Sequence, residues 1–277
     1  MSYFLANDNV KIFYEVKGEG KPIIFIHGWT CNHSFFKKQV ETLSKNYKVV
    51  TYDLRGHGVS ERPENGLTMN RMAKDVRNLI EHLNLSDVTL AGWSMGTTII
   101  LEYVRQFACD KLSNICFIDM TPKVVVEGDW HMGLFGEFSH KDNLNHIANV
   151  AGDWPKVIES FVPSLFATSG CRIKEDMDWV FEEVRKNTPH VVVDCWVSMS
   201  NEDYREELSK ITIPTLITRG EESAFCTKET CDYMEKEIKN AKWIDYSKCG
   251  HILFMEEAEK FNKDIVEFIE KLSLIHI

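Results

Sequence analysis

The segment that most constrains the fold of this chain is VTLAGWSMG, residues 88–96. A short apolar run rich in strand-forming residues leads into a Gly-x-Ser-x-Gly pentapeptide, and residues 97–104 carry an apolar surface suited to a buried helix. Strand, tight turn and helix are therefore predicted in that order. A side chain at Gly92 or Gly96 would collide with the neighbouring strand and helix, so Ser94 is expected in a strained turn, exposed at the end of the strand.

Seven other segments have the composition of strands, and most alternate with segments patterned as helices. Strands are expected at residues 3–6, 10–16, 23–26, 48–52, 112–118, 213–218 and 241–246, and helices at 36–43, after an N-cap at Thr68, at 230–238 and at 256–272. The first two strands, joined by the turn-forming triplet at residues 7–9, should form an antiparallel edge. The remaining alternation predicts an α/β fold with a mostly parallel, eight-stranded sheet covered by helices on both faces.

The stretch 122–204 differs from the rest of the chain. It is rich in aromatic residues, among them Trp130, Phe138 and Trp154, in helix-like stretches without a convincing core strand. A structureless loop of about 80 residues is not expected inside a compact domain. We therefore expect an α/β core made of residues 1–121 and 205–277, with residues 122–204 inserted as a helical cap.

Composition and charge limit the kinds of molecule that this protein is expected to bind. The formal net charge is −10 and no basic block occurs, which argues against nucleic acid and anionic membrane surfaces. No apolar run approaches the ~20 residues that span a bilayer, and the first residues lack a basic segment followed by a long apolar one. A cytoplasmic protein is expected. Eight cysteines at irregular spacings, without a CxxC pair, favour reduced thiols over disulfides or a zinc site.

Polar and glycine-flanked residues follow several predicted strands, where the reactive groups of a parallel sheet collect. Trp29 follows the strand at 23–26, and its amide is a candidate hydrogen-bond donor to an oxyanion, as is the amide of Met95 at a helix N-terminus. His27, directly after the same strand, is interpreted as bracing its loop.

A second glycine-containing loop, DLRGHGVS at residues 53–60, follows the strand at 48–52. Its Asp53 and His57 are residue types that catalysis uses. We interpret both as structural, because nothing else in this loop supplies a nucleophile.

Four motifs occur in an order known from one superfamily: HGW at 27–29, DLRGHGVS at 53–60, GWSMG at 92–96 and GH at 250–251. On these motifs the chain resembles the α/β-hydrolases, specifically their cap-bearing serine esterases and cofactor-free haloperoxidases, over its whole length except the cap. The resemblance implies that Ser94 is the nucleophile, that His251 is the general base, and that the amides of Trp29 and Met95 form the oxyanion hole. It implies no metal and no organic cofactor.

One position departs from the pattern of these relatives. Their acid usually sits three residues after the glycine that follows the seventh strand, and Ser223 occupies that place here. A serine cannot stabilise an imidazolium by charge. Asp119, at the end of the strand 112–118, is the expected triad acid, and Glu222 is the alternative. Asp119 also suits a purely structural role in the turn before Pro122.

The resemblance implies acyl transfer through a Ser94–His251–Asp119 triad on a small, largely apolar carboxylic ester or related acyl substrate. The candidate substrate-binding residues are Trp93, Trp130, Phe138 and Trp154. Carbon–carbon hydrolysis, lactonase and perhydrolase chemistry use the same triad and stay open, as does a non-catalytic protein of this fold that binds a ligand or partner. The sequence does not indicate the oligomeric state.

Overall fold

A single sheet forms the centre of the molecule. The computed structural model describes residues 2–169 and 174–273. Its strands are β1 (Ser2–Leu5), β2 (Lys11–Lys17), β3 (Pro22–Ile26), β4 (Lys48–Tyr52), β5 (Val88–Trp93), β6 (Leu112–Ile118), β7 (Thr215–Gly220) and β8 (Ala241–Tyr246). Their order across the sheet is β1-β2-β4-β3-β5-β6-β7-β8. The pairs β1–β2 and β2–β4 are antiparallel, and every later pair is parallel, which confirms the predicted α/β sheet.

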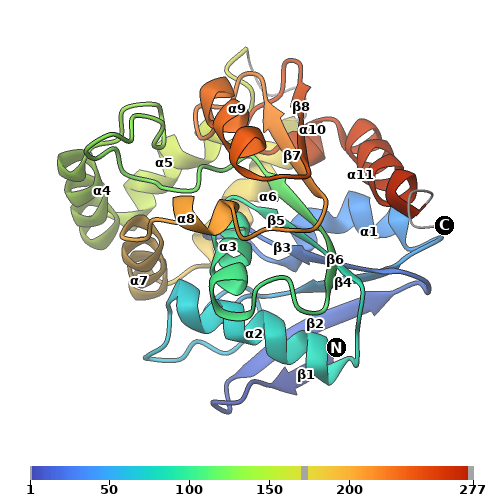
Figure 1. Ribbon diagram of the computed structural model, residues 1–277. Coiled ribbons are helices and arrows are strands. Elements are labelled where there is room, and N and C mark those ends of the chain that lie inside the picture. Colours follow the sequence, from blue (N-terminus) through green and yellow to red (C-terminus); the bar gives the residue numbers. More distant parts are fainter. Residues whose placement is uncertain (1, 170–173, 274–277) are drawn as a thin grey trace.

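Helices cover both faces of this sheet (Figure 1). On one side α2 (Met69–His82) packs against α3 (Met95–Phe107), with α9 (Lys228–Glu237) beside β8; on the other side α1 (Lys37–Leu43) contacts α11 (Ala258–Ser273). Because both faces are covered, the central strands have no polar side: all six residues of β5 are buried. Thr68 caps α2, and its Oγ1 accepts a hydrogen bond from the amide of Arg71 at 3.3 Å.

Two predicted helices differ in detail from the structure. The helix expected at 36–43 is preceded by a 3₁₀ turn, His33–Phe36, in which the Asn32 side chain accepts from the Ser34 amide. The helix expected at 256–272 corresponds to α11, which begins two residues later; a separate short helix, α10 (Leu253–Glu256), precedes it, and Glu257 between them leaves the helical region with φ −127° and ψ 54°.

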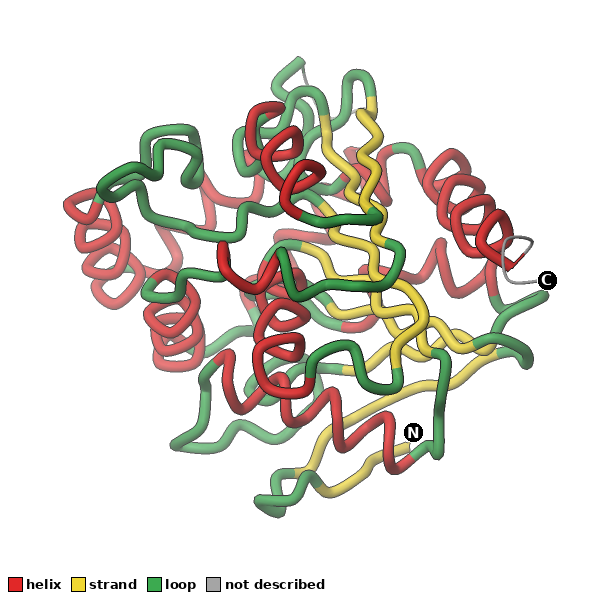
Figure 2. Tube along the Cα trace, in the orientation of Figure 1, coloured by secondary structure: helices red, strands yellow, loops and turns green. Residues whose placement is uncertain are grey.

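The segment between β6 and β7 carries helices and no strand of the sheet within its described part (Figure 2). These helices are α4 (His140–Gly152), α5 (Trp154–Ser164), α6 (Lys174–Arg185), α7 (Pro189–Ser200) and α8 (Arg205–Leu208). Residues 122–139 belong to the stretch expected to be helix-like, but they form a loop with isolated bridges, such as Glu127 with Trp130. Trp130 and Phe138 therefore lie in this loop, and only Trp154 lies on a helix.

Neither a membrane-spanning helix nor a disulfide was expected from the composition of the chain. No helix in residues 2–169 and 174–273 is long and apolar enough to cross a membrane. No disulfide joins the seven cysteines of those residues, and Cys171 lies outside them. The closest pair is Cys226 and Cys231, whose Sγ atoms are 3.6 Å apart.

Candidate functional site

The turn between β5 and α3 has the strained geometry expected from its glycines. Ser94 adopts φ 54° and ψ −121°, a backbone conformation that residues with a side chain rarely take. A Cβ at Gly92 would lie 2.4 Å from the carbonyl oxygen of Gly96, and a Cβ at Gly96 would lie 2.3 Å from that of Ile26. Ser94 is partly exposed among buried neighbours. The turn therefore presents its hydroxyl at the carboxyl end of the sheet.

The loop after β3 runs directly beside this serine. A Cβ at Gly28 would lie 3.1 Å from the Cβ of Ser94, so this position leaves almost no room for a side chain. In the described part of the chain no backbone or side-chain acceptor binds the amide N–H of Trp29. The amide of Met95 is in the first turn of α3, where N–H groups have no partner inside the helix. Two free donors thus flank the Ser94 turn.

Asp119 and His251 meet at the same edge of the sheet. Nδ1 of His251 lies 2.5 Å from Oδ2 of Asp119, and the two side chains are 1% and 0% exposed. Asp119 follows β6 with φ 51°, so it too has a strained backbone at a strand end. A carboxylate on Nδ1 fixes the ring so that Nε2 is the nitrogen left to exchange a proton.

The carboxylate of Asp119 has further partners that the sequence did not reveal. Ser223 donates from Oγ to Oδ2 at 2.5 Å, and the amide of Gly220 donates to Oδ1 at 3.1 Å. The ring of Phe225 stacks on the imidazole of His251, with centroids 3.9 Å apart and planes at 19°. One signal for this contact was available in the sequence. Ser223 occupies the position of the usual triad acid, and a residue at that position must lie close to the histidine.

The carboxylates of Glu221 and Glu222 have other partners. Glu222 accepts hydrogen bonds from Thr168 Oγ1 at 3.1 Å and from the Ser169 amide at 2.7 Å. Glu221 accepts from the amide of Lys248 at 3.3 Å. Among these acids it is Asp119 that reaches His251.

The loop that carries His251 is wedged between β7 and the end of α5. A Cβ at Gly220 would lie 2.0 Å from the carbonyl oxygen of Gly250, and a Cβ at Gly250 would lie 2.3 Å from the backbone of Phe166. The Ile252 amide donates to the Leu165 carbonyl at 3.0 Å. Both sides of the loop therefore touch backbone, which fixes the histidine from two directions.

Trp93, expected at the substrate site, lies beneath the histidine. Its Nε1 donates to the carbonyl oxygen of His251 at 2.8 Å, and its ring packs against His251 and Phe254 with centroid distances of 5.4 and 5.0 Å. The side chain is 1% exposed. Its contacts support the loop of His251.

The other three aromatic candidates occupy different places. The Trp154 ring contacts Trp29 edge to face at 5.5 Å, and Phe138 contacts Trp196, which in turn packs on Trp29. Trp130 instead packs on Tyr233 at 5.2 Å. A row of contacting rings connects the histidine to Trp29 by way of Phe225, Phe135, Phe138 and Trp196. We call the four contacting rings of Trp29, Trp154, Trp196 and Phe138 the apolar surround. The described ring contact of Trp130 is with Tyr233 and lies outside this surround.

The histidines of the β3 and β4 loops are buried and have local partners. The Leu54 amide donates to Nε2 of His27 at 3.0 Å, so Nδ1 carries the proton and donates to the Gly28 carbonyl at 2.8 Å. Burial, together with the neighbouring His57 ring, lowers the pKa of His27 to about 3. Burial also lowers the pKa of His57 to about 4. Both rings are neutral at pH 7.

A second aspartate–histidine pair lies at the end of β4. Oδ1 of Asp53 accepts from Nδ1 and from the amide of His33 at 2.7 and 2.8 Å, and Oδ2 accepts from the Val59 amide at 2.8 Å. The His33 ring packs on Phe13 of β2, and within the described part of the chain its hydrogen bonds and ring contact do not involve the Ser94 turn. The pair lines a small pocket of about 140 Å³.

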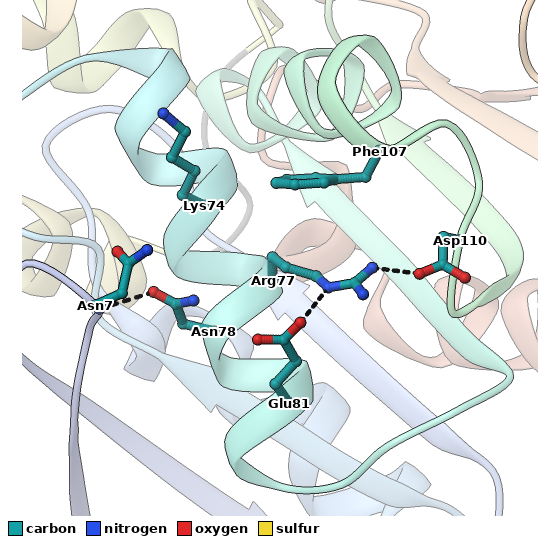
Figure 3. Close-up of a pocket in the computed structure, with 7 residues that line it drawn as sticks. All are labelled: Asn7, Lys74, Arg77, Asn78, Glu81, Phe107 and Asp110. Atoms are coloured by element: carbon teal, nitrogen blue, oxygen red, sulfur yellow. Dashed lines mark hydrogen bonds and ion pairs between the residues drawn. The ribbon is translucent and has the colours of Figure 1, made fainter.

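A shallow hollow of about 430 Å³ lies between α2 and the end of α3, and Figure 3 shows its lining. Arg77 spans it, bound by Glu81 at 2.6 Å and by Asp110, with the Phe107 ring 5.5 Å from its guanidinium. The side chains that line this hollow are mainly paired with one another. None of the strand-end residues described above contributes to it.

The architecture and the site define the class of protein. A mostly parallel sheet carries a strained strand–serine–helix turn, and an aspartate after β6 contacts a histidine in the loop after β8. Residues 21–258 match the family model described as the alpha/beta hydrolase fold. The chain belongs to this family.

Several proteins are similar over nearly the full length. An AB hydrolase superfamily protein of Bacillus subtilis is 28% identical over 96% of this chain and 98% of its own. A non-heme chloroperoxidase of Kitasatospora aureofaciens is 28% identical over 96% and 98%. A bifunctional esterase/perhydrolase of Acinetobacter calcoaceticus is 27% identical over 97% and 99%. The solved structure of an esterase from Exiguobacterium antarcticum superposes with a TM-score of 0.90 at 27% identity, covering 97% of this chain and 99% of the other. The expected esterase and haloperoxidase branch is thereby confirmed.

Proposed function

We propose that this protein is a serine hydrolase that cleaves small, largely apolar carboxylic esters. His251 takes the proton of Ser94, and the serine oxygen attacks the ester carbonyl carbon. The tetrahedral intermediate collapses to an acyl-enzyme as the alcohol leaves with the proton from His251, and a water deprotonated by His251 then releases the acid. Asp119 holds the imidazolium, and the amides of Trp29 and Met95 donate to the oxyanion.

The observation that carries this proposal is the buried contact of His251 with Asp119 beside the Ser94 turn. Burying a carboxylate without a partner is costly. The contact with His251 gives the buried Asp119 such a partner. Here Nδ1 and Oδ2 are 2.5 Å apart, which leaves Nε2 as the nitrogen available to act as a general base. The strained φ of 54° at Ser94 supports a functional role, since strain of this kind clusters at active sites.

The substrate class rests on the rings around the site. Trp29, Trp154 and Phe138 are buried against the helices of the segment between β6 and β7. We propose that residues 122–204 form a cap over the core of residues 1–121 and 205–277, and that this apolar surround accepts uncharged acyl or alkyl groups. Esters with a charged acyl group are expected to be poor substrates.

The test is the turnover of p-nitrophenyl butyrate, together with labelling by a serine-directed phosphonate. Ser94→Ala removes one oxygen and should lower kcat/KM by on the order of 10⁴-fold or more and abolish labelling, with an unchanged melting temperature. If the variant keeps a tenth of wild-type turnover, the proposal is wrong. If the wild type neither turns over esters nor reacts with the phosphonate, a non-catalytic member of the family is favoured.

A second candidate activity is perhydrolysis, in which hydrogen peroxide takes the place of water in the second step. The names of two relatives, a non-heme chloroperoxidase and a bifunctional esterase/perhydrolase, favour testing it. Peracid formation from acetic acid and hydrogen peroxide would be measured beside ester hydrolysis in the same preparation. Loss of both activities in Ser94→Ala would assign them to one site.

A further inference from the structure

The residue that stands in the usual place of the acid has a specific role in the structure. Ser223 is 9% exposed, and its hydroxyl donates to Oδ2 of Asp119, the oxygen that also contacts Nδ1 of His251. The other carboxylate oxygen accepts from the Gly220 amide. Asp119 thus accepts three hydrogen bonds, and Ser223 provides the one that shares an oxygen with the histidine.

The direction of this hydrogen bond is fixed by a second contact. The Phe225 amide donates to Oγ of Ser223 at 3.1 Å. Because an amide can only donate, the hydroxyl accepts there and turns its own proton to Asp119. The amide of Ser223 donates to the Gly220 carbonyl at 3.0 Å, so the turn that bears the hydroxyl is itself anchored to the end of β7.

The same short segment holds the imidazole ring. Phe225, two residues after Ser223, stacks on His251 with centroids 3.9 Å apart. The carbonyl oxygen of Ala224, between them, accepts from the Phe135 amide at 2.9 Å. Residues 223–225 therefore touch the acid with one side chain and the base with another.

We propose that Ser223 is a positioning residue for the reaction, which acts through Asp119 and does not touch the substrate. This inference rests on the proposed function. Its hydroxyl holds Oδ2 where a lone pair faces Nδ1, so that the acid need not reorient when the imidazolium forms. Ser223 also stabilises the negative charge of the carboxylate and so weakens its hold on the proton of the imidazolium.

Other ionisable groups surround this pair and stay unchanged in a Ser223 variant. The Cys226 thiol is buried, and its hydrogen bond with Cys231 and its burial raise its pKa well above the usual value. Glu256 accepts from the Gly250 amide at 2.6 Å and Glu222 from residues 168–169. A shift that appears when only Ser223 is changed is therefore attributable to the lost hydroxyl.

Ser223→Ala is the first test, with kcat, KM, the rate of phosphonate labelling and the pH profile of kcat/KM as readouts. We expect kcat to fall by about 5- to 50-fold, KM to change less than twofold, and the acidic limb of the profile to move to higher pH by about 0.3–1 unit. Ser223→Thr, which keeps a hydroxyl, should restore most of kcat and return the limb to its wild-type position.

Ser60→Ala is a matched control. The Ser60 hydroxyl accepts from the Phe13 amide at 2.9 Å and donates to the main-chain carbonyl of Asp53 at 2.6 Å, so it makes a similar pair of bonds but does not bind a carboxylate. Ser60→Ala should lower the melting temperature. It should not change the pH profile or the kcat calculated per phosphonate-reactive Ser94. If Ser223→Ala behaves like Ser60→Ala, Ser223 is only structural and the inference is wrong.

The two proposals fail in different ways. If Ser94→Ala keeps its activity, the proposed function fails. If Ser94→Ala and Asp119→Asn lose activity while Ser223→Ala keeps wild-type kcat and pH profile, only the role of Ser223 is overturned.

Discussion

Among residues 2–169 and 174–273, two aspartates that follow strands, Asp119 and Asp53, each contact a histidine, and the surroundings of these two pairs differ. At the end of β6, Asp119 and His251 are almost fully buried, and their partners are Ser223, Gly220 and the stacked ring of Phe225. At the end of β4, Asp53 is buried but His33 is 22% exposed. What separates the pairs is the strained Ser94 turn next to the first one and the burial of both of its partners. We expect this difference, and not the short Asp–His contact alone, to mark a catalytic pair.

The pairs also differ in how their aspartates are used. Asp53 binds the amides of His33 and Val59 in addition to the ring, so it organises the backbone of two loops. Asp119 binds one backbone amide, from Gly220, and two side chains. The first arrangement suits a structural role, and the second suits the role proposed for Asp119, which is to position the side chain of His251.

The largest effect expected from this comparison follows from removing each carboxylate charge. Asp119→Asn should lower kcat by roughly 10²- to 10⁴-fold with little change in KM, because the imidazolium loses its partner and the tautomer is no longer fixed. Asp53→Asn should leave kcat per folded molecule within about threefold but lower the free energy of unfolding by about 2–4 kcal/mol. Steady-state kinetics and denaturant unfolding measure both.

The control for that comparison is Glu222→Gln, which should leave kcat nearly unchanged because its carboxylate binds residues 168–169. A larger loss of kcat in Glu222→Gln than in Asp119→Asn would move the acid to the loop after β7. A larger loss in Asp53→Asn would exchange the roles of the two pairs.

A carboxylate at position 223 should partly replace the one at position 119. Ser223 Oγ lies 2.5 Å from Oδ2 of Asp119, so an aspartate there is placed to reach Nδ1 of His251. The double variant Asp119→Asn, Ser223→Asp should recover at least about 10-fold in kcat over Asp119→Asn alone. No recovery would show that the backbone of the β7 loop does not bring this position within reach of the ring.

Acid should destabilise the fold through the neutral rings near the second pair. His27, with a pKa of about 3, and His57, with a pKa of about 4, lie below the ordinary value of 6.5. The unfolded chain therefore binds protons first, and the stability that each ring contributes is complete above pH 6.5 and lost as the pH falls toward the folded pKa, about 3 for His27 and about 4 for His57. Between pH 6.5 and 4 the loss should be about 3 kcal/mol for each ring, at about 1.4 kcal/mol per pH unit.

His27→Gln tests this assignment. Glutamine can accept from the Leu54 amide but does not titrate, so the slope of unfolding free energy against pH should become smaller between pH 6.5 and 4. The measurement is urea unfolding at four pH values. An unchanged slope would place the acid sensitivity elsewhere, for instance in the nearby Asp53 and His33.

The smallest effect is expected at His33 and has the opposite pH dependence. Burial opposes the charge of His33, but the hydrogen bond and charge of Asp53 outweigh it and raise its pKa. The stability from this pair is therefore present below pH 6.5 and lost as the pH rises through the raised pKa. His33→Gln should cost on the order of 1 kcal/mol or less at pH 6, given solvent screening, and less at pH 8.5. Turnover should stay within about twofold. A larger loss at pH 8.5 than at pH 6 would contradict this.

Much of the fold could be predicted from sequence because its strands are short apolar runs bounded by turn residues. The expected strands at 48–52, 112–118 and 241–246 match the structure to the residue. The ends of helices were less predictable: nothing in the sequence at Glu257 marks the break between α10 and α11. In the loop 119–139 the aromatic residues have no helical period to follow, so the position of Trp130 against Tyr233 was not foreseeable.

The candidate site was predictable in part, for a physical reason. Parallel strands bring their carboxyl ends to one edge, so Ser94, Asp119 and His251 could be expected near one another. The role of Ser223 needs a contact across 104 residues of chain, and neither periodicity nor local propensity reports such a contact. The same holds for the stacking of Phe225 on the histidine.

The close packing of the His251 loop against residues 166–167 limits which parts of the segment between β6 and β7 can move. Gly250 leaves no room beside residues 166–167, and Glu256 ties the Gly250 and Ala167 amides together at 2.6 and 3.0 Å. The end of α5 can therefore not swing away without dragging the histidine out of register with Ser94. If residues 122–204 form the proposed cap, we expect α4 and α7 to move more than the end of α5 when a substrate enters.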